Sequence, residues 1–463
     1  MKIGLLDLCG IGLYFLVVLG LALLTRKTRT FSEFAVGNRR VPAAMLFASL
    51  AATYIGPGFS VGFTGKAFGT GYLFYFLVVT YALQTILMGV VFAPRLSRFR
   101  DCCTVGDVME RKYGGVARVL SGIVSVGLCI GFAAIMGKIA GGLLSSMTGL
   151  NLTVAIFMVT MFVALYSFTG GIRAGIAMDA MQFSWFSLIV PVLLLMAVFR
   201  AQDFDAGAKA VSLTGEGFAG MTWLQLVGVA ASFLFGETLI PPYAHRALAA
   251  RSDAASSRGF ILAGAYSLVW LFICATLGIY AHGYIDPATP ADDVFLSMGR
   301  ILLPYGSFGL LLAGVIAIVM SSQESVLNAG TVCLVRDIIG SGFALSDRAS
   351  LLLSRVGTLL IAIIAALAAR YSPSIIDGLL VCYSLWAPAL LLPLLLGLYL
   401  KRTAPLAGVL SILCGAGTSI AWQMFLHEPA GIPAILVGLL ASALAYGLGH
   451  LLTAGDNLRE VYQ

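Results

Sequence analysis

The stretch Ala52-Thr53-Tyr54-Ile55-Gly56-Pro57-Gly58-Phe59 interrupts a long apolar run, 43–64, near its middle. Glycine weakens a helix, and proline lacks the backbone N–H that a helix interior needs, so Gly-Pro-Gly predicts a break in the helix. Such a break frees backbone carbonyl and N–H groups, which need other partners. Which partners these freed groups find depends on whether the chain around the break lies in water or in lipid.

The composition answers that question. Of 463 residues, 60% are hydrophobic and only 11% are charged, whereas a soluble globular domain carries about 25% charged residues. There are too few charges to cover a soluble surface of this size, which excludes a soluble enzyme, a DNA-binding protein and a secreted disulfide scaffold. The chain is predicted to be an all-α integral membrane protein. Its expected partners include the lipid bilayer and do not include nucleic acid.

Apolar runs of about 20 residues, the length that crosses a bilayer, recur about thirteen times with short connections. We therefore expect about 13 transmembrane helices in a single domain, 1–463. With the N-terminus outside and the C-terminus in the cytoplasm, most of the 28 Lys and Arg lie on the inner side, as the positive-inside rule requires. The six expected on the outer side are Lys2, Lys66, Arg200, Lys209, Arg300 and Arg370.

A second interruption predicts an internal repeat. Phe235-Gly236-Glu237-Thr238 precedes Pro241-Pro242, five apolar segments after the first break. Because five is odd, the two broken helices have opposite orientations, which is the pattern of an inverted repeat in transporters. We expect a five-plus-five inverted repeat formed by 42–199 and 223–399. The first helix, 1–30, and the C-terminal helices, 400–463, are expected at the periphery.

Ionisable and hydroxyl side chains inside the membrane mark functional sites by default. Asp179, Glu237 and Glu324 are such residues, and Ser321, Ser322 and Ser325 fall on nearly one helix face. Together with carbonyls freed at the first break, these hydroxyls would form an oxygen-lined cavity suited to a hard cation such as Na⁺. Proton binding and simple helix packing by small residues remain open at this point.

Glu237 has two interpretations. It is either the counter-charge of an amino or other cationic group on a solute, or a hydrogen-bonded gate residue facing outward. Lys66, shortly after the first break, is a candidate ion-pair partner that would cancel its charge. Near the two breaks and the ninth segment, the candidate solute contacts are Thr53, Tyr54, Gly56, Phe59, Phe233, Glu237, Gln323 and Tyr383.

An ordered set of motifs resembles the sodium:solute symporter family. The set comprises Phe31 to Pro42, Tyr166 to Gly171 followed by Asp179 and Gln182, His245 to Ala250, and Ser321-Ser322 with Leu327-Asn328-Ala329-Gly330 and Arg336-Asp337-Ile338. The resemblance implies the five-plus-five fold of the bacterial leucine transporter and Na⁺-coupled alternating access.

Carried over residue by residue, the resemblance implies a Na⁺ site and an inner ion path. The Na⁺ ligands would be the hydroxyls of Ser321 and Ser322 and the carbonyls of Ala52, Ile55 and Ile318, and Asp179 would lie on the inner path. The residues after Pro57 lack the polar side chains that sugar-carrying members place there, so a sugar is less favoured than an amino acid, an organic acid or another nitrogenous compound.

The sequence thus predicts a secondary active transporter of a bacterial inner membrane, which carries a small organic solute into the cell with Na⁺ as the coupling ion. The alternatives are an H⁺-coupled transporter of the same fold and a membrane sensor that does not transport. An enzyme is not expected, because the four histidines lie at helix ends without metal-ligand spacing.

Overall fold

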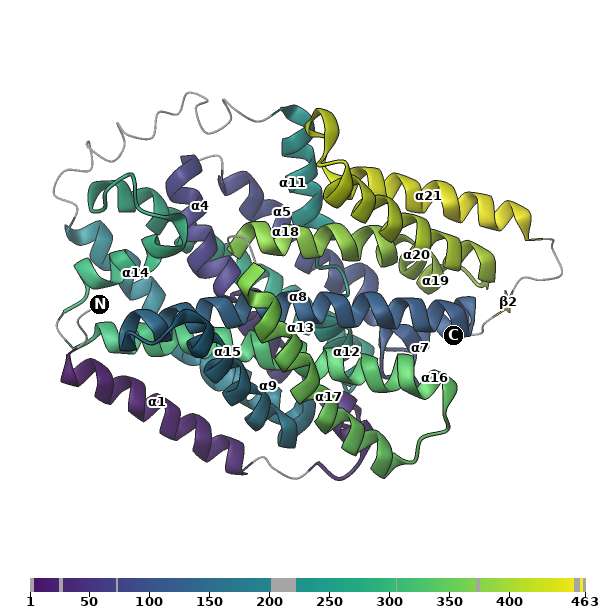
Figure 1. Ribbon diagram of the computed structural model, residues 1–463, viewed down its shortest axis with the longest axis horizontal. Helices are drawn as coiled ribbons and strands as arrows, with labels where there is room; N and C mark the ends of the chain where they lie inside the picture. Colours follow the sequence, from purple (N-terminus) through teal and green to yellow (C-terminus); the bar gives the residue numbers. More distant parts are fainter. Residues whose placement is uncertain are drawn as a thin grey trace.

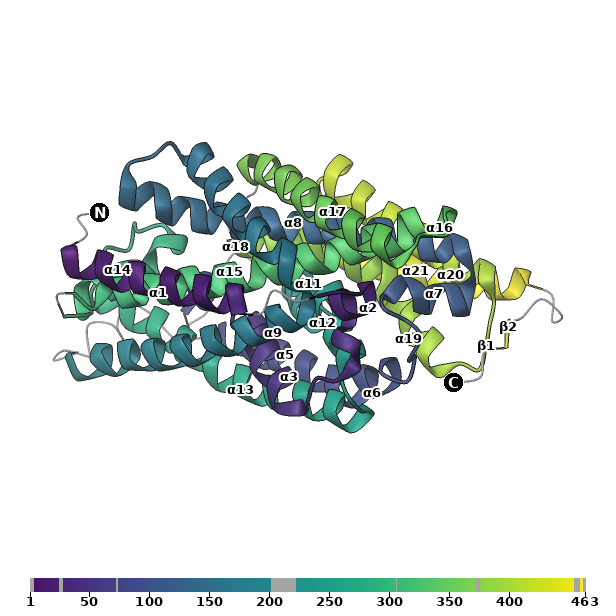
Figure 2. The same cartoon turned by 90° about the horizontal axis from the view of Figure 1, so that it is seen from below.

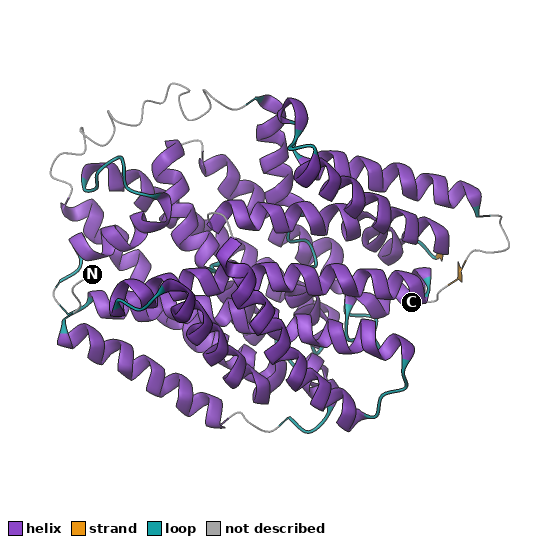
Figure 3. Cartoon of the chain, viewed as in Figure 1, coloured by secondary structure: helices purple, strands orange, loops and turns teal. Residues whose placement is uncertain are grey.

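The computed structural model describes residues 4–24, 28–71, 74–200, 222–304, 306–371, 375–453 and 459–460. Lys2 and Lys209, two of the six basic residues expected on the outer side, lie outside these ranges. The described chain is helical almost throughout (Figure 3). Its one two-stranded antiparallel pairing joins β1 (Arg402–Thr403) to β2 (Arg459–Glu460). The predicted all-α fold class is confirmed.

The long helices run along the longest axis of the molecule, with α1 at one edge and α20 and α21 at another (Figures 1 and 2). In the first part of the chain the helices are α1 (Leu5–Leu24), α2 (Phe31–Val36), α3 (Ala43–Tyr54), α4 (Phe63–Thr70), α5 (Phe74–Leu87), α6 (Ala93–Leu96), α7 (Val105–Tyr113), α8 (Gly115–Thr148) and α9 (Leu152–Arg200). They are followed by α11 (Trp223–Phe235), α12 (Pro241–Ala249), α13 (Asp253–Tyr280), α14 (Ala291–Leu302), α15 (Phe308–Cys333), α16 (Gly340–Gly342), α17 (Asp347–Ala368), α18 (Ile375–Trp386), α19 (Leu392–Tyr399), α20 (Pro405–Ile420) and α21 (Ala434–Leu452).

Among the described residues, nine helical segments are long and apolar enough to cross a membrane, and one bent pair raises this to ten. Three shorter apolar helices accompany them, at Leu5–Val18, Leu152–Phe168 and Trp223–Phe235. The chain is therefore a multi-pass membrane protein, while the count of about 13 crossings stays a prediction.

The first predicted break is present. α3 ends at Tyr54, a π-helical turn, η2 (Gly58–Gly62), leads into α4, and the two halves are bent by 56°. Pro57 has no N–H for the Thr53 carbonyl, and the Gly56 amide donates to that carbonyl instead, at 3.1 Å. The Ala52 carbonyl thereby loses the helical partner that Gly56 would provide, which is the local consequence expected of proline.

The second break separates α11 from α12. Residues 236–239 form a turn, and Leu239 adopts the left-handed conformation with φ of 54°. Pro241 restarts the helix at its first turn, where a missing N–H costs nothing. Both broken helices predicted from the sequence are therefore confirmed.

Helix α15 lies at the centre of the fold and packs against α1, α3, α8, α9, α12 and α17 (Figures 1 and 2). Its residues from Leu311 to Cys333 are buried. This placement explains why Ser321, Ser322, Gln323, Glu324 and Ser325 are enclosed by protein and do not face lipid.

Helix α9 turns sharply at Gly171. This residue has φ of 59° and ψ of −171°, a conformation essentially restricted to glycine. The turn divides α9 into the two spans 152–168 and 176–199 that the sequence predicts, and it positions Asp179 in the second of them.

Candidate ion and solute sites

Asp179 is held by residues from three other helices. Its Oδ1 accepts a hydrogen bond from the Ser321 hydroxyl of α15. Its Oδ2 accepts from the Ser49 hydroxyl of α3 at 2.5 Å and from Nη2 of Arg246, on α12, at 2.8 Å. All four side chains are buried. Asp179 is therefore the centre of a charge-paired network.

Arg246 extends this network. Its Nε donates to the Ser49 hydroxyl at 2.7 Å, and its Nη2 donates to the Ser325 hydroxyl at 2.7 Å. Its Nη1 donates to the Pro242 carbonyl at 3.0 Å. A buried charge needs such compensation, and here one guanidinium joins both broken helices to α9 and α15.

Ser322 lies directly beside the first break. A methyl group added at Gly56 would come within 2.9 Å of the Ser322 hydroxyl oxygen. That hydroxyl is buried and has no hydrogen-bond partner among the described residues. The predicted ligands Ala52 and Ile55 flank this contact on α3, and the Ile55 carbonyl also accepts from the Ser60 hydroxyl at 2.6 Å.

The oxygen atoms at this place suit a hard cation. A free serine hydroxyl and carbonyls at a helix break are neutral oxygen ligands, the type that hard cations take. Ser321 keeps its oxygen lone pairs while its proton is directed to Asp179. Ile318 lies one helical turn before Ser322 on α15, so its carbonyl belongs to the same part of the helix.

Glu237 lies at the second break and is surrounded by tyrosine. The hydroxyls of Tyr81, Tyr243 and Tyr383 donate to its carboxylate at 2.6, 2.8 and 2.5 Å. They come from α5, α12 and α18. Glu237 is 2% exposed, so its carboxylate is removed from water.

The predicted aromatic residues meet at the same place. The ring of Tyr54 stacks on that of Tyr243, with centroids 4.4 Å apart, and the ring of Phe59 stacks on that of Tyr81 at 3.9 Å. Phe233 makes edge contacts with Phe59, Tyr81 and Tyr383. We call Glu237 with these six aromatic residues the carboxylate cage.

Two predicted solute residues have side chains that hydrogen-bond to other groups of the protein. The Gln323 amide nitrogen donates to the Ala133 carbonyl at 3.0 Å and to Thr160 Oγ1 at 3.2 Å, which directs this side chain toward α8 and α9. Thr53 donates to the Ser49 carbonyl within its own helix at 3.0 Å. Gly56 is at the break, next to Ser322.

The suggested Lys66–Glu237 pair is not formed. Lys66 Nζ lies 3.2 Å from Asp377 Oδ1, at the start of α18. The Lys66 ammonium and the Asp377 carboxylate are both partly exposed, so each stays partly in water. Glu237 is instead buried inside the fold. Glu324 instead lines a cavity of about 10 Å³ with His245 and Asn328.

Sequence reasoning missed Ser49, Tyr81, Tyr243 and the role of Arg246. Arg246 was visible as an arginine shortly after a predicted break, and an ionisable group at that depth is itself a signal. Tyr81 and Tyr243 carried no comparable signal, because an aromatic residue in a membrane helix is common and its direction depends on packing.

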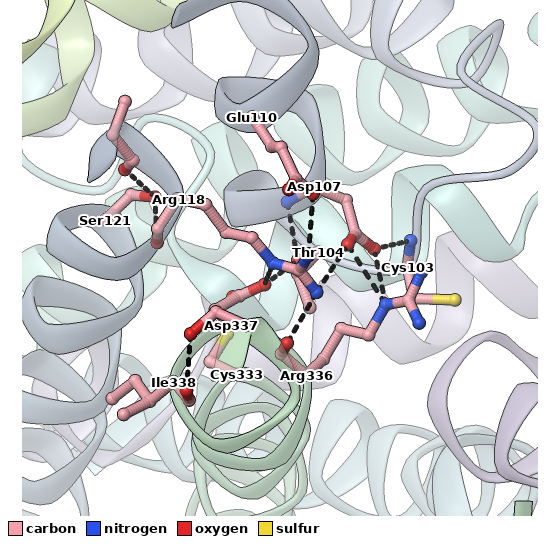
Figure 4. A network of polar contacts seen from close by, with 12 residues as sticks. Cys103, Thr104, Asp107, Glu110, Arg118, Ser121, Cys333, Arg336, Asp337 and Ile338 are labelled. Atoms are coloured by element: carbon pink, nitrogen blue, oxygen red, sulfur yellow. Dashed lines mark hydrogen bonds and ion pairs between the residues drawn. The ribbon is translucent and has the colours of Figure 1, made fainter. Parts of the chain in front are cut away.

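A second charged network lies at the end of the molecule at which α7 and α16 lie (Figures 1 and 4). Arg118 Nη1 pairs with Glu110 at 2.6 Å, and its Nη2 pairs with Asp107 at 3.3 Å. Arg336 Nε also pairs with Asp107, at 3.0 Å, and Thr104 Oγ1 donates to Asp337 at 2.6 Å. These contacts tie α7 and α8 to the end of α15, and we call them the end network.

A cavity of about 200 Å³ lies toward the opposite end. Its lining includes Val61 from η2, Lys138 from α8, and Asp292 and Asp293 from α14. Burial raises the pKa of the Asp292 carboxyl. The two sites in the middle thus lie between this cavity and the end network.

The arrangement matches that of known transporters. The sequence model of the "Sodium:solute symporter family" matches residues 34–415. The chain belongs to this family. It is therefore a Na⁺-coupled symporter of a small organic solute, and not an enzyme.

Similar proteins cover nearly the whole chain. The sodium/pantothenate symporter of Escherichia coli is 27% identical over 468 residues, covering 94% of each protein. The high-affinity proline transporter PutP of Bacillus subtilis is 25% identical over 457 residues, covering 92% of this chain and 94% of that protein.

Solved structures share the fold. A Na⁺-coupled sialic acid symporter, in a substrate-bound outward-open state, matches with a TM-score of 0.83 at 18% identity, over 99% of this chain and 100% of that one. Mhp1, a nucleobase-cation-symport-1 family transporter, matches with a TM-score of 0.61 at 12% identity, over 90% of this chain and 94% of that one. The predicted inverted-repeat symporter fold with two broken helices is confirmed.

Proposed function

We propose that this symporter binds Na⁺ between the break after α3 and Ser321-Ser322 of α15, and binds its solute in the carboxylate cage between the two breaks. The observation that carries the ion site is the Ser322 hydroxyl, which is buried without a partner among the described residues and faces Gly56. A buried polar group without a partner costs free energy. A cation at this place would remove that cost by accepting the oxygen as a ligand.

The neighbouring ligands would be the Ser321 hydroxyl and the carbonyls of Ala52, Ile55 and Ile318. The Ala52 carbonyl has lost the Gly56 amide as a partner, since that amide donates to Thr53. The Ala52 carbonyl on α3 and the Ser322 hydroxyl on α15 therefore each have an oxygen lone pair available for a cation. Bound Na⁺ would tie these two helices together.

Alternating access would then follow from the same contacts. A ligand shifts a conformational equilibrium toward the state to which it binds more tightly. Na⁺ held between α3 and α15 would favour the state with the outer cavity open, and solute bound between the two breaks would favour the inward-open state. Asp179 would line the ion exit on the inner side once its contact with Arg246 loosens.

We further infer that the N-terminus is outside and the C-terminus is cytoplasmic, in a bacterial inner membrane. In Figure 1, α1 begins at one end of the long axis and α21 ends at the other. The basic residues Arg118 and Arg336 lie at the same end as the end of α21, which supports a cytoplasmic location of that end. The repeat boundaries 42–199 and 223–399 remain predictions.

The test is Na⁺-dependent protection against thermal unfolding of the purified protein, with K⁺ holding the ionic strength constant. A ligand that binds only the folded state at 100 times its Kd adds about 2.7 kcal/mol. We expect Na⁺ to raise the unfolding midpoint and K⁺ to have no such effect. Ser322→Ala should abolish the rise.

A glycine pair provides the matched control. Gly56→Ala would place a methyl group 2.9 Å from the Ser322 oxygen, whereas Gly69→Ala in α4 meets nothing within 4 Å. Na⁺ protection should be weakened by the first change and kept by the second. Equal protection of the wild type, Ser322→Ala and Gly56→Ala would contradict this ion site.

A further inference from the structure

We propose that the solute is a small organic cation, a protonated amine or a quaternary ammonium, held by Glu237 and the rings of the carboxylate cage. This inference rests on the proposed function, which places the solute between the two breaks. It goes beyond that function because it assigns the charge of the solute.

The first argument is charge. In the part of the chain that the structure describes, Glu237 contacts tyrosine hydroxyls and forms no ion pair with arginine, lysine or histidine. Asp179, a buried carboxylate on α9, is paired with Arg246 at 2.8 Å. Buried charges are normally paired. A cationic solute would provide Glu237 with the partner that the protein does not.

The second argument is hydrogen bonding. A carboxylate offers about four lone-pair positions, and the hydroxyls of Tyr81, Tyr243 and Tyr383 fill three of them. One position is left for a donor on the solute, the N–H of a protonated amine or the O–H of a hydroxylated quaternary ammonium. The hydroxyls also fix the orientation of the carboxylate, since they come from α5, α12 and α18.

The third argument is the aromatic surroundings of Glu237. The rings of Tyr54 and Tyr243 stack on each other, as do those of Phe59 and Tyr81, and Tyr54 contacts Tyr81 edge to face, so each stacked ring keeps one face for other contacts. Aromatic faces attract a cation, most strongly when it is desolvated, and quaternary ammonium ligands are recognised by such rings. An anionic solute would meet repulsion from both the carboxylate and the negative ring faces.

The cage also offers polar contacts for the rest of the solute. The Tyr54 hydroxyl and the Gln84 side-chain amide are buried close to each other and to Thr85. Both lie on the helices that form the cage, α3 and α5. They suit a hydroxyl or carbonyl substituent of the cation.

The experiment compares solutes of different charge on the full-length protein in Na⁺ buffer. The probes are choline and ethylamine as cations, proline as a zwitterion and pantothenate as an anion, each added at constant ionic strength. Binding is measured by titration calorimetry and by the unfolding midpoint. We expect choline or ethylamine to bind, with at least tenfold weaker binding to Glu237→Gln. Proline and pantothenate should bind more weakly than these cations.

Glu237→Gln keeps the size of the side chain and an oxygen acceptor for the tyrosines. Its Na⁺ protection, measured without solute, reports whether the variant is folded and whether the ion site is intact. Tyr81→Phe removes one hydroxyl only, so it should weaken cation binding less than Glu237→Gln. If Glu237→Gln does not fold, Tyr81→Phe and Tyr383→Phe test the cage in its place.

Three results would overturn the proposal. They are tighter binding of pantothenate or proline than of both cations, undiminished cation binding by Glu237→Gln, and no cation binding by a wild-type protein that Na⁺ still protects. Loss of Na⁺ protection in the wild type would instead contradict the proposed ion site. The two failures are therefore distinguishable.

Discussion

Arg246 places a guanidinium inside the membrane domain, where Asp179 balances its charge and Ser49 and Ser325 accept its N–H groups. Desolvation of such a pair opposes its mutual attraction, so the pair adds little net stability compared with apolar residues. Removal of only one partner is strongly destabilising, because the remaining charge would be buried without compensation. The contact therefore fixes how α12 meets α3, α9 and α15.

Asp179→Asn and Arg246→Gln should each strongly destabilise the protein, since removal of one partner of a buried pair costs about 3–5 kcal/mol. The double variant Asp179→Asn/Arg246→Gln should lose less than the sum of the two. Unfolding midpoints of the three variants measure this double-mutant cycle. Effects that add to within about 0.5 kcal/mol would mean that the pair is not coupled.

At this scale, some residues were predictable from the sequence and others were not. Ser321, Ser322, Asp179 and Glu237 are site candidates because hydroxyl and carboxyl groups are rare in apolar segments and need partners there, and the structure buries all four. Gln323 was a candidate by the same reasoning, yet its side chain points toward α8 and α9. The direction of a side chain depends on the rotation of α15 against its neighbours, which one sequence does not specify.

Among the elements, the turn in α9 depends most on one residue. Gly171 has a positive φ, and a methyl group there would lie 2.7 Å from the Cα atom of Phe34. Any other residue would be strained in its backbone and would collide with α2. The turn sets the direction of the second half of α9, and hence the position of Asp179.

We expect Gly171→Ala to destabilise the protein by about 1–3 kcal/mol, the range for a strained backbone conformation. Gly127→Ala is the control, because Gly127 lies in α8 with nothing within 4 Å of the added methyl group. Alanine in a helix interior is favoured over glycine, so the control should be as stable as the wild type or more so. The unfolding midpoint in detergent checks both, and a neutral Gly171→Ala would show that the turn can relax.

The two breaks were predictable as elements, because Gly56-Pro57-Gly58 and Pro241-Pro242 remove helical N–H groups or weaken the helix in a chemically defined way. The turn at Gly171 was predictable only as a gap between two apolar runs. The hydropathy of a segment does not indicate whether one of its glycines has a positive φ, and glycine is common in membrane helices.

For the whole molecule, the end network joins α7 and α8 to the end of α15 (Figure 4), at the face that we assign to the cytoplasm. Cys103 reports on this junction, since its amide donates to Asp107 at 2.7 Å. Burial raises the pKa of the Cys103 thiol to about 11. The thiolate is the reactive form, so alkylation should be slow at neutral pH while the network is closed.

Arg336→Gln should increase the rate of maleimide labelling in a variant that keeps Cys103 and carries serine at the other seven cysteines. The reason is that Arg336 pairs with Asp107 across the closed face, so its loss shifts the population toward the open state. Arg111→Gln is the control, because its pair with Asp101 is at the surface and such pairs are worth little. Arg336 also lowers the pKa of the Cys103 thiol, so its loss alone slows labelling. Labelling that is no faster than in Arg111→Gln at equal thiolate fraction would show that the network does not hold this face closed.

The overall architecture was the most predictable level. Composition required a membrane protein, and the spacing of the two breaks required opposed halves. The number of crossings does not follow from composition, because helices such as Trp223–Phe235 are short and a bent pair can be counted once or twice.

The ion pair between Asp179 and Arg246 also has an electrical consequence. Because the two charges cancel, their movement during reorientation carries no net current, and the current of a transport cycle belongs to Na⁺ and the solute. A potential of about 100 mV contributes about 2.3 kcal/mol per charge moved, equivalent to roughly a 50-fold concentration ratio. With one Na⁺ per solute, a neutral solute would draw on one such charge per cycle and a cationic solute would draw on two. The charge of the cargo is therefore the ratio of current to solute flux minus the ratio of Na⁺ flux to solute flux.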